Sequence, residues 1–194
     1  AWGHWRGNRF ARAFDGMLCL FPFEPDYLLP LGLDARFISH PEAFNPAYDV
    51  VGHAAGMPNS DASPQLTLLP GSRRSELDHL LDPMLAAISM LRDDMPDLPV
   101  QLPTLPHLAD RISASIAASG LGDTITVRSD EGGLFDALAG SHAVMATSGT
   151  VTLQTALFGV PGVACYKVPA LSAFIGRRLV RMDRVILPNA LVDR

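Results

Sequence analysis

The second half of the chain alternates short apolar runs with longer segments in which apolar residues recur every three to four positions. The clearest example is the segment 75–95, whose apolar residues share the i, i+3, i+4, i+7 spacing. They are Leu77, Leu80, Leu81, Met84, Leu85, Ile88 and Leu91. This spacing is typical of a helix that turns one face to a core. A helix is therefore expected over 75–95, with Ser75 and Asp78 resembling a capping box.

The same pattern predicts a repeating order of strands and helices. Strands are expected at 65–69, 98–102, 124–128, 143–146 and 162–166. Further helices are expected at 107–119, 134–139, 149–158 and 171–182. Strands that alternate with helices indicate βαβ units and a parallel sheet. The carboxyl ends of such strands lie along one edge of the sheet, where ligands bind.

The chain divides into three parts. Residues 1–45 are interpreted as the end of one domain, with a helix near 2–14 and strands near 16–21 and 35–38. Residues 46–64 are rich in Gly, Pro, Asn and Ser, and this composition predicts a linker. Residues 65–194 form the second domain. The chain starts at Ala1 without Met, so it is interpreted as a fragment of a longer protein.

The turn after the strand at 65–69 is the strongest candidate site. Pro70 and Gly71 end the strand, and Ser72, Arg73 and Arg74 lead directly into the helix. A glycine turn at a helix N-terminus presents N–H groups and the positive end of the helix dipole. Arginine binds phosphate in a bidentate manner, so the turn fits a diphosphate. An ordinary turn with solvated arginines is the alternative.

A second helix N-terminus repeats this arrangement. Residues 147–150 read Thr-Ser-Gly-Thr and join the predicted strand at 143–146 to the helix at 149–158. The alternative is a plain N-cap made of small residues. Because both turns follow parallel strands, they can face one cleft. Two such turns in one sheet strengthen the prediction of an anionic ligand.

The net charge and the absence of several motifs argue against some classes of function. The net charge of −5 argues against a nucleic-acid partner. No Gly-x-x-x-x-Gly-Lys, Gly-x-Gly-x-x-Gly or Asp-x-Asp motif is present, and the histidines lack metal-ligand spacing. No metal or cofactor is therefore expected. Cys19 and Cys165 are expected as buried, reduced thiols, and His40 as a structural or capping residue.

Two clusters combine basic residues with aromatic or apolar ones. The first cluster is Trp2, Trp5, Arg6, Arg9 and Arg12. The second is Arg177, Arg178, Arg181 and Arg184, mixed with Phe174, Ile175, Leu179 and Val180. Both clusters could lie on an anionic membrane surface, and the alternative is a solvated helix face. No apolar run is long enough to span a membrane.

Several stretches together resemble the lipid-A-disaccharide synthase family, in the family's order across nearly the whole chain. They are Ala1-Trp2-Gly3-x-Trp5-Arg6, Leu18-Cys19-Leu20-Phe21-Pro22-Phe23-Glu24-Pro25, His40-Pro41, Leu68-Leu69-Pro70-Gly71-Ser72-Arg73-Arg74-Ser75-Glu76, Ser148-Gly149-Thr150-Val151-Thr152-Leu153, Tyr166-Lys167, Arg177-Arg178-Leu179-Val180 and Leu187-Pro188-Asn189. The resemblance implies an α/β fold of the GT-B type, with two Rossmann-like domains whose parallel sheets carry helices on both faces. The chain would hold the end of the N-terminal domain and most of the nucleotide-sugar-binding C-terminal domain.

The resemblance also implies a reaction. UDP-2,3-diacylglucosamine would condense with 2,3-diacylglucosamine 1-phosphate to give lipid A disaccharide 1-phosphate and UDP. An inverting displacement needs a general base and a cation that stabilises departing UDP. The family's catalytic aspartate lies upstream of Ala1, so the base is not assigned. The enzyme would be cytoplasmic and peripheral on the inner face of the inner membrane, and a homodimer is left open.

The roles of individual residues follow from the resemblance. Arg73 would stabilise the leaving group. The other substrate-binding residues would be Gly71, Ser72, Ser148, Gly149, Thr150, Gln154 and Asn189. Gln154 replaces the usual glutamate that binds the ribose hydroxyls, and Ser39 replaces the usual glycine before His-Pro. The segment 42–44 is also atypical.

Two other functions share the predicted fold or ligand. A UDP-N-acetylglucosamine 2-epimerase-like enzyme would need carboxylates and histidines in the cleft, and the cluster at Trp2–Arg12 argues against it. A non-catalytic UDP-sugar-binding module is the third alternative, because the expected base is absent from the chain.

Overall fold

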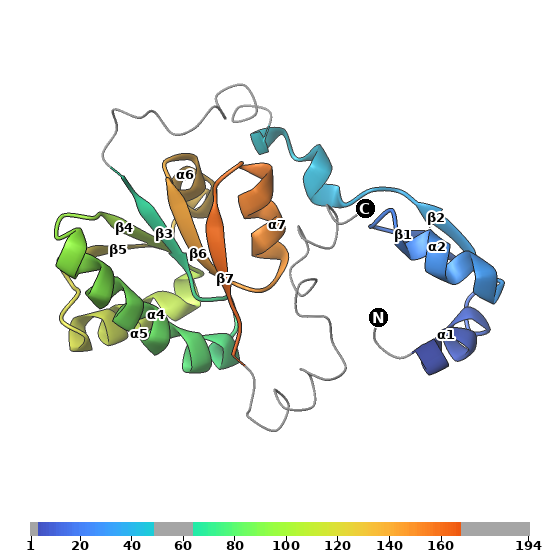
Figure 1. Ribbon diagram of the computed structural model, residues 1–194, viewed down its shortest axis with the longest axis horizontal. Coiled ribbons are helices and arrows are strands. Elements are labelled where there is room, and N and C mark those ends of the chain that lie inside the picture. Colours follow the sequence, from blue (N-terminus) through green and yellow to red (C-terminus); the bar gives the residue numbers. More distant parts are fainter. Residues whose placement is uncertain (1–3, 49–63, 168–194) are drawn as a thin grey trace.

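The computed structural model describes residues 4–48 and 64–167, with side chains from residue 7 onward (Figure 1). These ranges contain a two-stranded and a five-stranded sheet, and all strand pairs in both are parallel. The alternating pattern of the second half therefore forms the parallel α/β sheet that was predicted.

The five-stranded sheet has the order β5-β4-β3-β6-β7. Its strands are β3 (Leu66–Leu69), β4 (Val100–Pro103), β5 (Ile125–Arg128), β6 (Ala143–Thr147) and β7 (Gly162–Cys165). The chain enters at the central strand β3, builds outward to β5, and returns to the other side of β3 with β6 and β7. The strand order thus reverses between β3 and β6, which pair from Leu66↔Ala143 to Leu69↔Ala146. Ligands of doubly wound sheets bind at such a switch point, beyond the carboxyl ends of the strands.

Helices cover both faces of this sheet. They are α4 (Arg74–Asp94), α5 (Pro106–Ala118), α6 (Gly133–Ala139) and α7 (Thr150–Leu157). Figure 1 shows α4 and α5 together on one face, and α6 and α7 on the other. Two separate apolar clusters agree with this division, because one joins α4 and α5 to β3–β5 and the other joins α6 and the end of α7 to β6.

The larger cluster is the main core. In this cluster, the predicted apolar stripe of α4 packs against alternate side chains of the strands. Its fully buried members include Leu68, Met84, Ile88, Val100, Leu102, Leu108 and Ile112. Burial of each such Leu, Ile or Met side chain contributes about 1.5–3 kcal/mol relative to exposure. The helical period read from the sequence therefore decides which face of α4 lies on the sheet.

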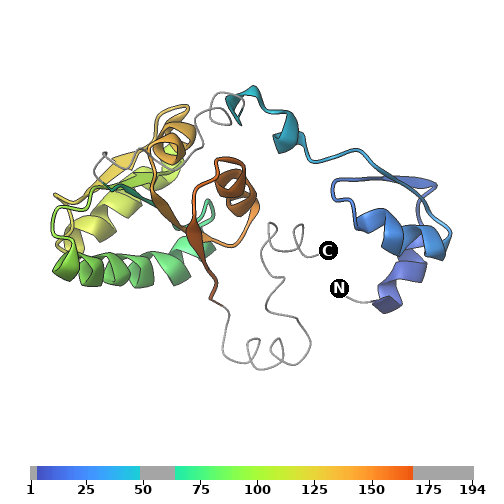
Figure 2. The same ribbon diagram turned by 45° about the horizontal axis from the view of Figure 1, so that its top comes forward.

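The N-terminal residues form a smaller unit. Its elements are α1 (His4–Ala11), β1 (Gly16–Cys19), α2 (Glu24–Leu28), the 3-10 helix η1 (Leu29–Leu31) and β2 (Asp34–Phe37). Figure 2 shows α1 and α2 beside the pair of strands. Its buried core is Ala11, Cys19, Leu28, Leu33 and Ala35. Leu18 of β1 remains 64% exposed and Phe37 of β2 remains 48% exposed, so this sheet is only partly covered.

Two 3-10 helices follow the small sheet, η2 (Pro41–Phe44) and η3 (Pro46–Tyr48). The prediction that His40 caps is confirmed, because its Nδ1 atom accepts a hydrogen bond from the Glu42 N–H group at 3.2 Å. Tyr48 is buried in the second apolar cluster of the large sheet. Tyr48, at the start of the predicted linker, therefore packs on the larger unit.

Two local predictions need correction. Cys19 and Cys165 are free thiols, but only Cys19 is buried, while Cys165 on the edge strand β7 is half-buried. The capping box expected from Ser75 and Asp78 is wrong. Helix α4 starts one residue earlier, at Arg74, and Asp78 is paired with Arg111 of α5.

Candidate functional site

A cavity of about 690 Å³ lies at the carboxyl ends of the strands. Its walls come from the turns that follow β3, β4, β5 and β6, together with the first residues of α7. The cavity is therefore at the switch point between β3 and β6. Its volume is within the ordinary range for sites that hold a small ligand.

The turn between β3 and α4 is built around a carboxylate of its own helix. Glu76 Oε2 accepts hydrogen bonds from the N–H groups of Ser72 at 2.9 Å and Arg73 at 3.2 Å. Glu76 is the third residue of α4, and from this position a glutamate reaches back to the N-cap. The N–H groups expected to be open to a ligand are thus already satisfied by Glu76.

Glu76 also holds the arginine of this turn. Its Oε1 atom lies 2.7 Å from Arg73 Nη1, and the Arg73 side chain is 77% exposed. Gly71 has φ +114°, and a Cβ atom at this position would overlap the Glu76 carboxylate. The glycine is therefore needed because Glu76 folds back against it. The result is a guanidinium that is held at one end and open to the cavity.

The turn between β6 and α7 has a different construction. The Ser148 N–H group donates to the Cys165 carbonyl of β7 at 3.2 Å, which continues the sheet. Gly149 is the N-cap of α7, and no side chain caps this helix. Of the first N–H groups of α7, that of Thr152 donates to the Gly149 carbonyl at 3.1 Å, while those of Thr150 and Val151 have no acceptor within the helix. Thus the start of α7 lines the cavity with the positive end of the helix and without a side-chain cap.

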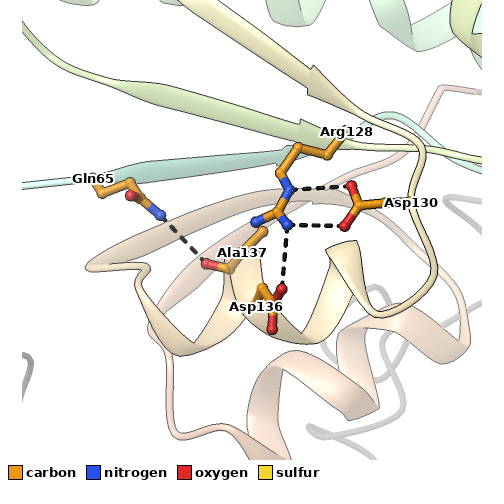
Figure 3. Close-up of polar contacts among 5 residues, drawn as sticks. All are labelled: Gln65, Arg128, Asp130, Asp136 and Ala137. Carbon is orange, nitrogen blue, oxygen red and sulfur yellow. Dashed lines mark hydrogen bonds and ion pairs between the residues drawn. The ribbon is translucent and has the colours of Figure 1, made fainter.

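The strand β5 ends at the cavity in a cluster of charges that the sequence reasoning missed. Arg128 donates to both carboxylate oxygens of Asp130, at 3.3 and 2.9 Å, and to Asp136 of α6 at 3.2 Å (Figure 3). The hydrogen bonds from Arg128 lower the pKa of Asp130. An arginine at a strand end followed two residues later by an aspartate was the signal available in the sequence. This guanidinium is committed to two carboxylates, unlike that of Arg73.

Gln154 lines the cavity from the second turn of α7, and Tyr48 packs near the end of the same helix. The Tyr48 hydroxyl donates a hydrogen bond to Glu42 Oε2, and the Tyr48 ring packs against Phe158 at the end of α7. Burial, and then the hydrogen bond to Glu42, raise the pKa of Tyr48. The segment 42–44, noted as atypical in the sequence, is thus joined through Tyr48 to the apolar cluster that includes the end of α7.

The structure brings most of the predicted site residues together. Those that line the cavity are Gly71, Ser72, Arg73, Ser148, Gly149, Thr150 and Gln154. Asn189 lies outside the described residues, as do Trp2, the side chains of Trp5 and Arg6, and the basic cluster at 174–184. Within the ranges 4–48 and 64–167, no group of three or more His, Cys, Asp or Glu side chains is placed to hold a metal ion.

Comparison with known proteins assigns the chain to one family. The family model described as lipid-A-disaccharide synthetase matches residues 1–194. The chain is 36% identical over 196 residues to the lipid-A-disaccharide synthase of Rhodospirillum centenum, covering 100% of this chain and 48% of that protein. It is 37% identical over 199 residues to that of Anaeromyxobacter sp. strain K, covering 100% of this chain and 50% of that protein. The chain therefore spans about half the length of the curated relatives it matches.

A solved structure supports the fold. A crystal structure of S. aureus TarM in complex with fondaparinux, alpha-GlcNAc-glycerol and UDP has a TM-score of 0.51 and 13% sequence identity. That likeness covers 87% of this chain and 33% of TarM, and it agrees with the predicted GT-B arrangement of a parallel sheet flanked by helices. The family model covers every residue, and the matching relatives carry its name. The chain therefore belongs to the lipid-A-disaccharide synthetase family.

Proposed function

We propose that the protein is an inverting, metal-independent glycosyltransferase of lipid A biosynthesis. It would condense UDP-2,3-diacylglucosamine with 2,3-diacylglucosamine 1-phosphate and release UDP. The observation that supports this most strongly is the cavity at the switch point. There the Arg73 guanidinium and the open N-terminus of α7 line the same space. Family membership supplies the chemistry that this anion site would serve.

The donor diphosphate would lie between the two turns. Negative charge develops on UDP as the glycosidic bond to the sugar breaks, and fixed positive groups stabilise that charge. Arg73 would contact the diphosphate directly, because one side of its guanidinium is held by Glu76 and the rest is exposed. The N–H groups at the start of α7 would bind the same phosphates, beside Ser148 and Thr150.

The first turn would act mainly through its side chains. Because the N–H groups of Ser72 and Arg73 donate to Glu76, Gly71 and Ser72 would shape the turn and the Arg73 side chain would carry the positive charge. Gln154 would contact the ribose hydroxyls. Asn189 remains part of the proposed donor site, and the general base is unassigned.

The remaining proposals concern the whole protein. Residues 65–194 would form the donor-binding domain, residues 1–45 the end of the acceptor-side domain, and 46–64 the linker. The protein would bind the cytoplasmic face of the inner membrane through its basic and aromatic clusters, and a homodimer stays open. None of the helices in the described ranges is long and apolar enough to cross a membrane.

Calorimetry with UDP in the absence of divalent metal tests the donor site. Wild-type protein should bind, and Arg73→Ala should bind about 10- to 100-fold more weakly, because a charge-assisted hydrogen bond contributes about 1.5–3 kcal/mol. Arg74→Ala is the matched control, since Arg74 is adjacent but does not line the cavity. Equal binding by both variants would remove Arg73 as the anchor. Failure of folded wild-type protein to bind UDP would contradict the donor-site proposal.

A further inference from the structure

The turn after β1 is closed by the same kind of contact as the turn after β3. Glu24 Oε2 accepts hydrogen bonds from the N–H groups of Leu20 at 2.9 Å and Phe21 at 3.0 Å. Glu76 Oε2 accepts from two consecutive N–H groups of the turn before α4 in the same way. In both turns a glutamate of the following helix occupies these backbone donors. Each turn can therefore offer a ligand mainly its side chains.

The side chains of the turn after β1 are aromatic. The rings of Phe21 and Phe23 are parallel, with an interplanar angle of 2° and a centroid separation of 5.6 Å. Phe23 is 45% exposed, whereas Phe21 is half-buried. Glu24 holds the N–H group of Phe21, so it fixes the backbone from which one ring of the pair extends. The result is a stacked pair whose second ring is open to solvent.

His40 joins this pair from the end of β2. Its ring centroid lies 5.7 Å from that of Phe21. The two strands remain paired beyond β2, because the Ile38 N–H group donates to the Cys19 carbonyl at 2.9 Å. His40 Nδ1 accepts from the Glu42 N–H group, and a ring nitrogen that accepts carries no proton. The His40 proton is therefore on Nε2, where it can be donated to a ligand.

Phe21, Phe23 and His40 lie beyond the carboxyl ends of two parallel strands, the edge at which α/β sheets bind ligands. The face of an aromatic ring is negative and attracts the polarised C–H groups of a sugar. We propose that these three residues bind the pyranose ring of the acceptor sugar. Its C–H face would lie on Phe23, and one of its oxygens would accept from His40 Nε2. Glu24 would be a positioning residue, and the inference rests on the proposed function, which supplies the acceptor.

An acyl chain is the other part of the acceptor that could cover an exposed phenylalanine. A hydrocarbon chain gains from any apolar surface and has no use for a hydrogen-bond donor, because the hydrophobic effect is non-directional. Here a donor on His40 stands beside two parallel rings. A flat ring face next to a polar donor suits a sugar, which has both C–H groups and oxygens. The arrangement therefore favours the sugar ring over the acyl chain.

The test uses glucosamine 1-phosphate, which is the proposed acceptor without its acyl chains. Saturation-transfer difference NMR should show transfer from the wild-type protein to the ring C–H protons of this probe. Phe23→Ala should weaken its binding by about three- to tenfold, as expected for the loss of one aromatic contact. Phe14→Ala is the matched control, because Phe14 is also exposed and packs on a second phenylalanine but lies before β1. Equal affinity of wild type and Phe23→Ala would overturn the proposal.

Two conservative variants separate sugar stacking from general apolar contact. Phe23→Tyr keeps the ring face and should keep the affinity for glucosamine 1-phosphate. Phe23→Leu remains apolar but lacks a ring, so it should bind as weakly as Phe23→Ala. Wild-type affinity in Phe23→Leu would show that any apolar side chain is sufficient, and this would contradict the sugar platform.

The positioning role of Glu24 has its own comparison. Glu24→Ala should weaken binding of glucosamine 1-phosphate, and Glu24→Gln should restore it, because an amide oxygen can still accept from the two N–H groups. UDP affinity should stay unchanged in both, since Glu24 does not line the cavity. Wild-type binding of the sugar phosphate by folded Glu24→Ala would remove this role.

UDP also separates this inference from the proposed function. Phe23 does not line the cavity, so Phe23→Ala should bind UDP as the wild type does. Wild-type protein that binds UDP but not glucosamine 1-phosphate would overturn the sugar platform and leave the donor site intact. Failure of the folded wild type to bind UDP would instead contradict the proposed function.

Discussion

The turns before α4 and α7 each contain a glycine and a serine, but they present different groups to the cavity. Each joins a central strand to a helix through Gly71 or Gly149. In the first turn, Glu76 occupies the N–H groups and leaves a tethered guanidinium exposed. In the second, no side chain caps the helix. One turn therefore offers a positioned cation, and the other offers the positive end of a helix that no side chain caps.

This difference depends on one residue beyond each turn. Glu76 is the third residue of α4, whereas Thr152 is the third residue of α7. The Thr152 hydroxyl donates to the carbonyl of the N-cap residue Gly149 at 2.7 Å, whereas Glu76 accepts from backbone N–H groups. A glycine turn at a helix N-terminus is thus insufficient to identify a phosphate site. The residue at the third helical position decides whether the N–H groups remain available.

The largest expected effect is a loss of stability when Gly71, in the turn before α4, is replaced. Gly71→Ala should lower the free energy of unfolding by about 3 kcal/mol, because it adds a strained positive φ and an overlap with the Glu76 carboxylate. Gly120→Ala is the matched control, since Gly120 also has a positive φ but a Cβ atom there meets open space. Urea unfolding of the two variants separates the overlap from the strain. Equal destabilisation would show that Glu76 does not require the glycine.

The next largest expected effect is on UDP binding at the turn before α7. The test gives this turn a carboxylate, which the turn before α4 already has in Glu76. Gly149→Asp places a carboxylate at the N-cap of α7, and it should weaken UDP binding by at least about tenfold while stabilising the helix by a few tenths of a kcal/mol. A Cβ atom at position 149 has no neighbour within 4 Å, so the variant should fold. Gly149→Ala is the control and should retain UDP affinity by calorimetry. If the two variants bind alike, the N-terminus of α7 is not the anion site.

The smallest expected effect concerns the third turn, after β5. Arg128 lowers the pKa of Asp130, so their pairing favours the folded state above the ordinary carboxyl pKa and loses this contribution as pH falls through the lowered value. Arg128→Gln should return the Asp130 titration, followed by NMR, toward its ordinary range. The free energy of unfolding should change little, because ion pairs that are partly open to solvent contribute little to stability.

The matched control for that titration is the pair between α4 and α5. Arg111 lowers the pKa of Asp78 through their hydrogen bond. Neither residue lines the cavity. Arg111→Gln should move the Asp78 titration and leave that of Asp130 unchanged. A shift of Asp130 in Arg111→Gln but not in Arg128→Gln would contradict the assignment of Arg128 as its partner.

Much of the larger unit follows from the local pattern. The apolar stripe of α4 and the five strand positions were predicted to within about two residues at each end. Right-handed connections between parallel strands predicted that the turns before α4 and α7 lie at the same edge of the sheet. Residues of both turns line the cavity. The start of α4 was wrong by one residue, and this shift replaced the Ser75–Asp78 capping box by the interaction of Glu76 with the turn.

The sequence by itself determined which segments form strands and helices, because apolar period is a property of neighbouring residues. Tertiary structure alone decided which polar groups remain available in the cavity. Glu76 accepts hydrogen bonds from the N–H groups of the turn before α4, and Asp130 and Asp136 pair with Arg128. Hydrogen bonds depend on distances of about 3 Å, and those distances are fixed only when the sheet brings its strand ends together.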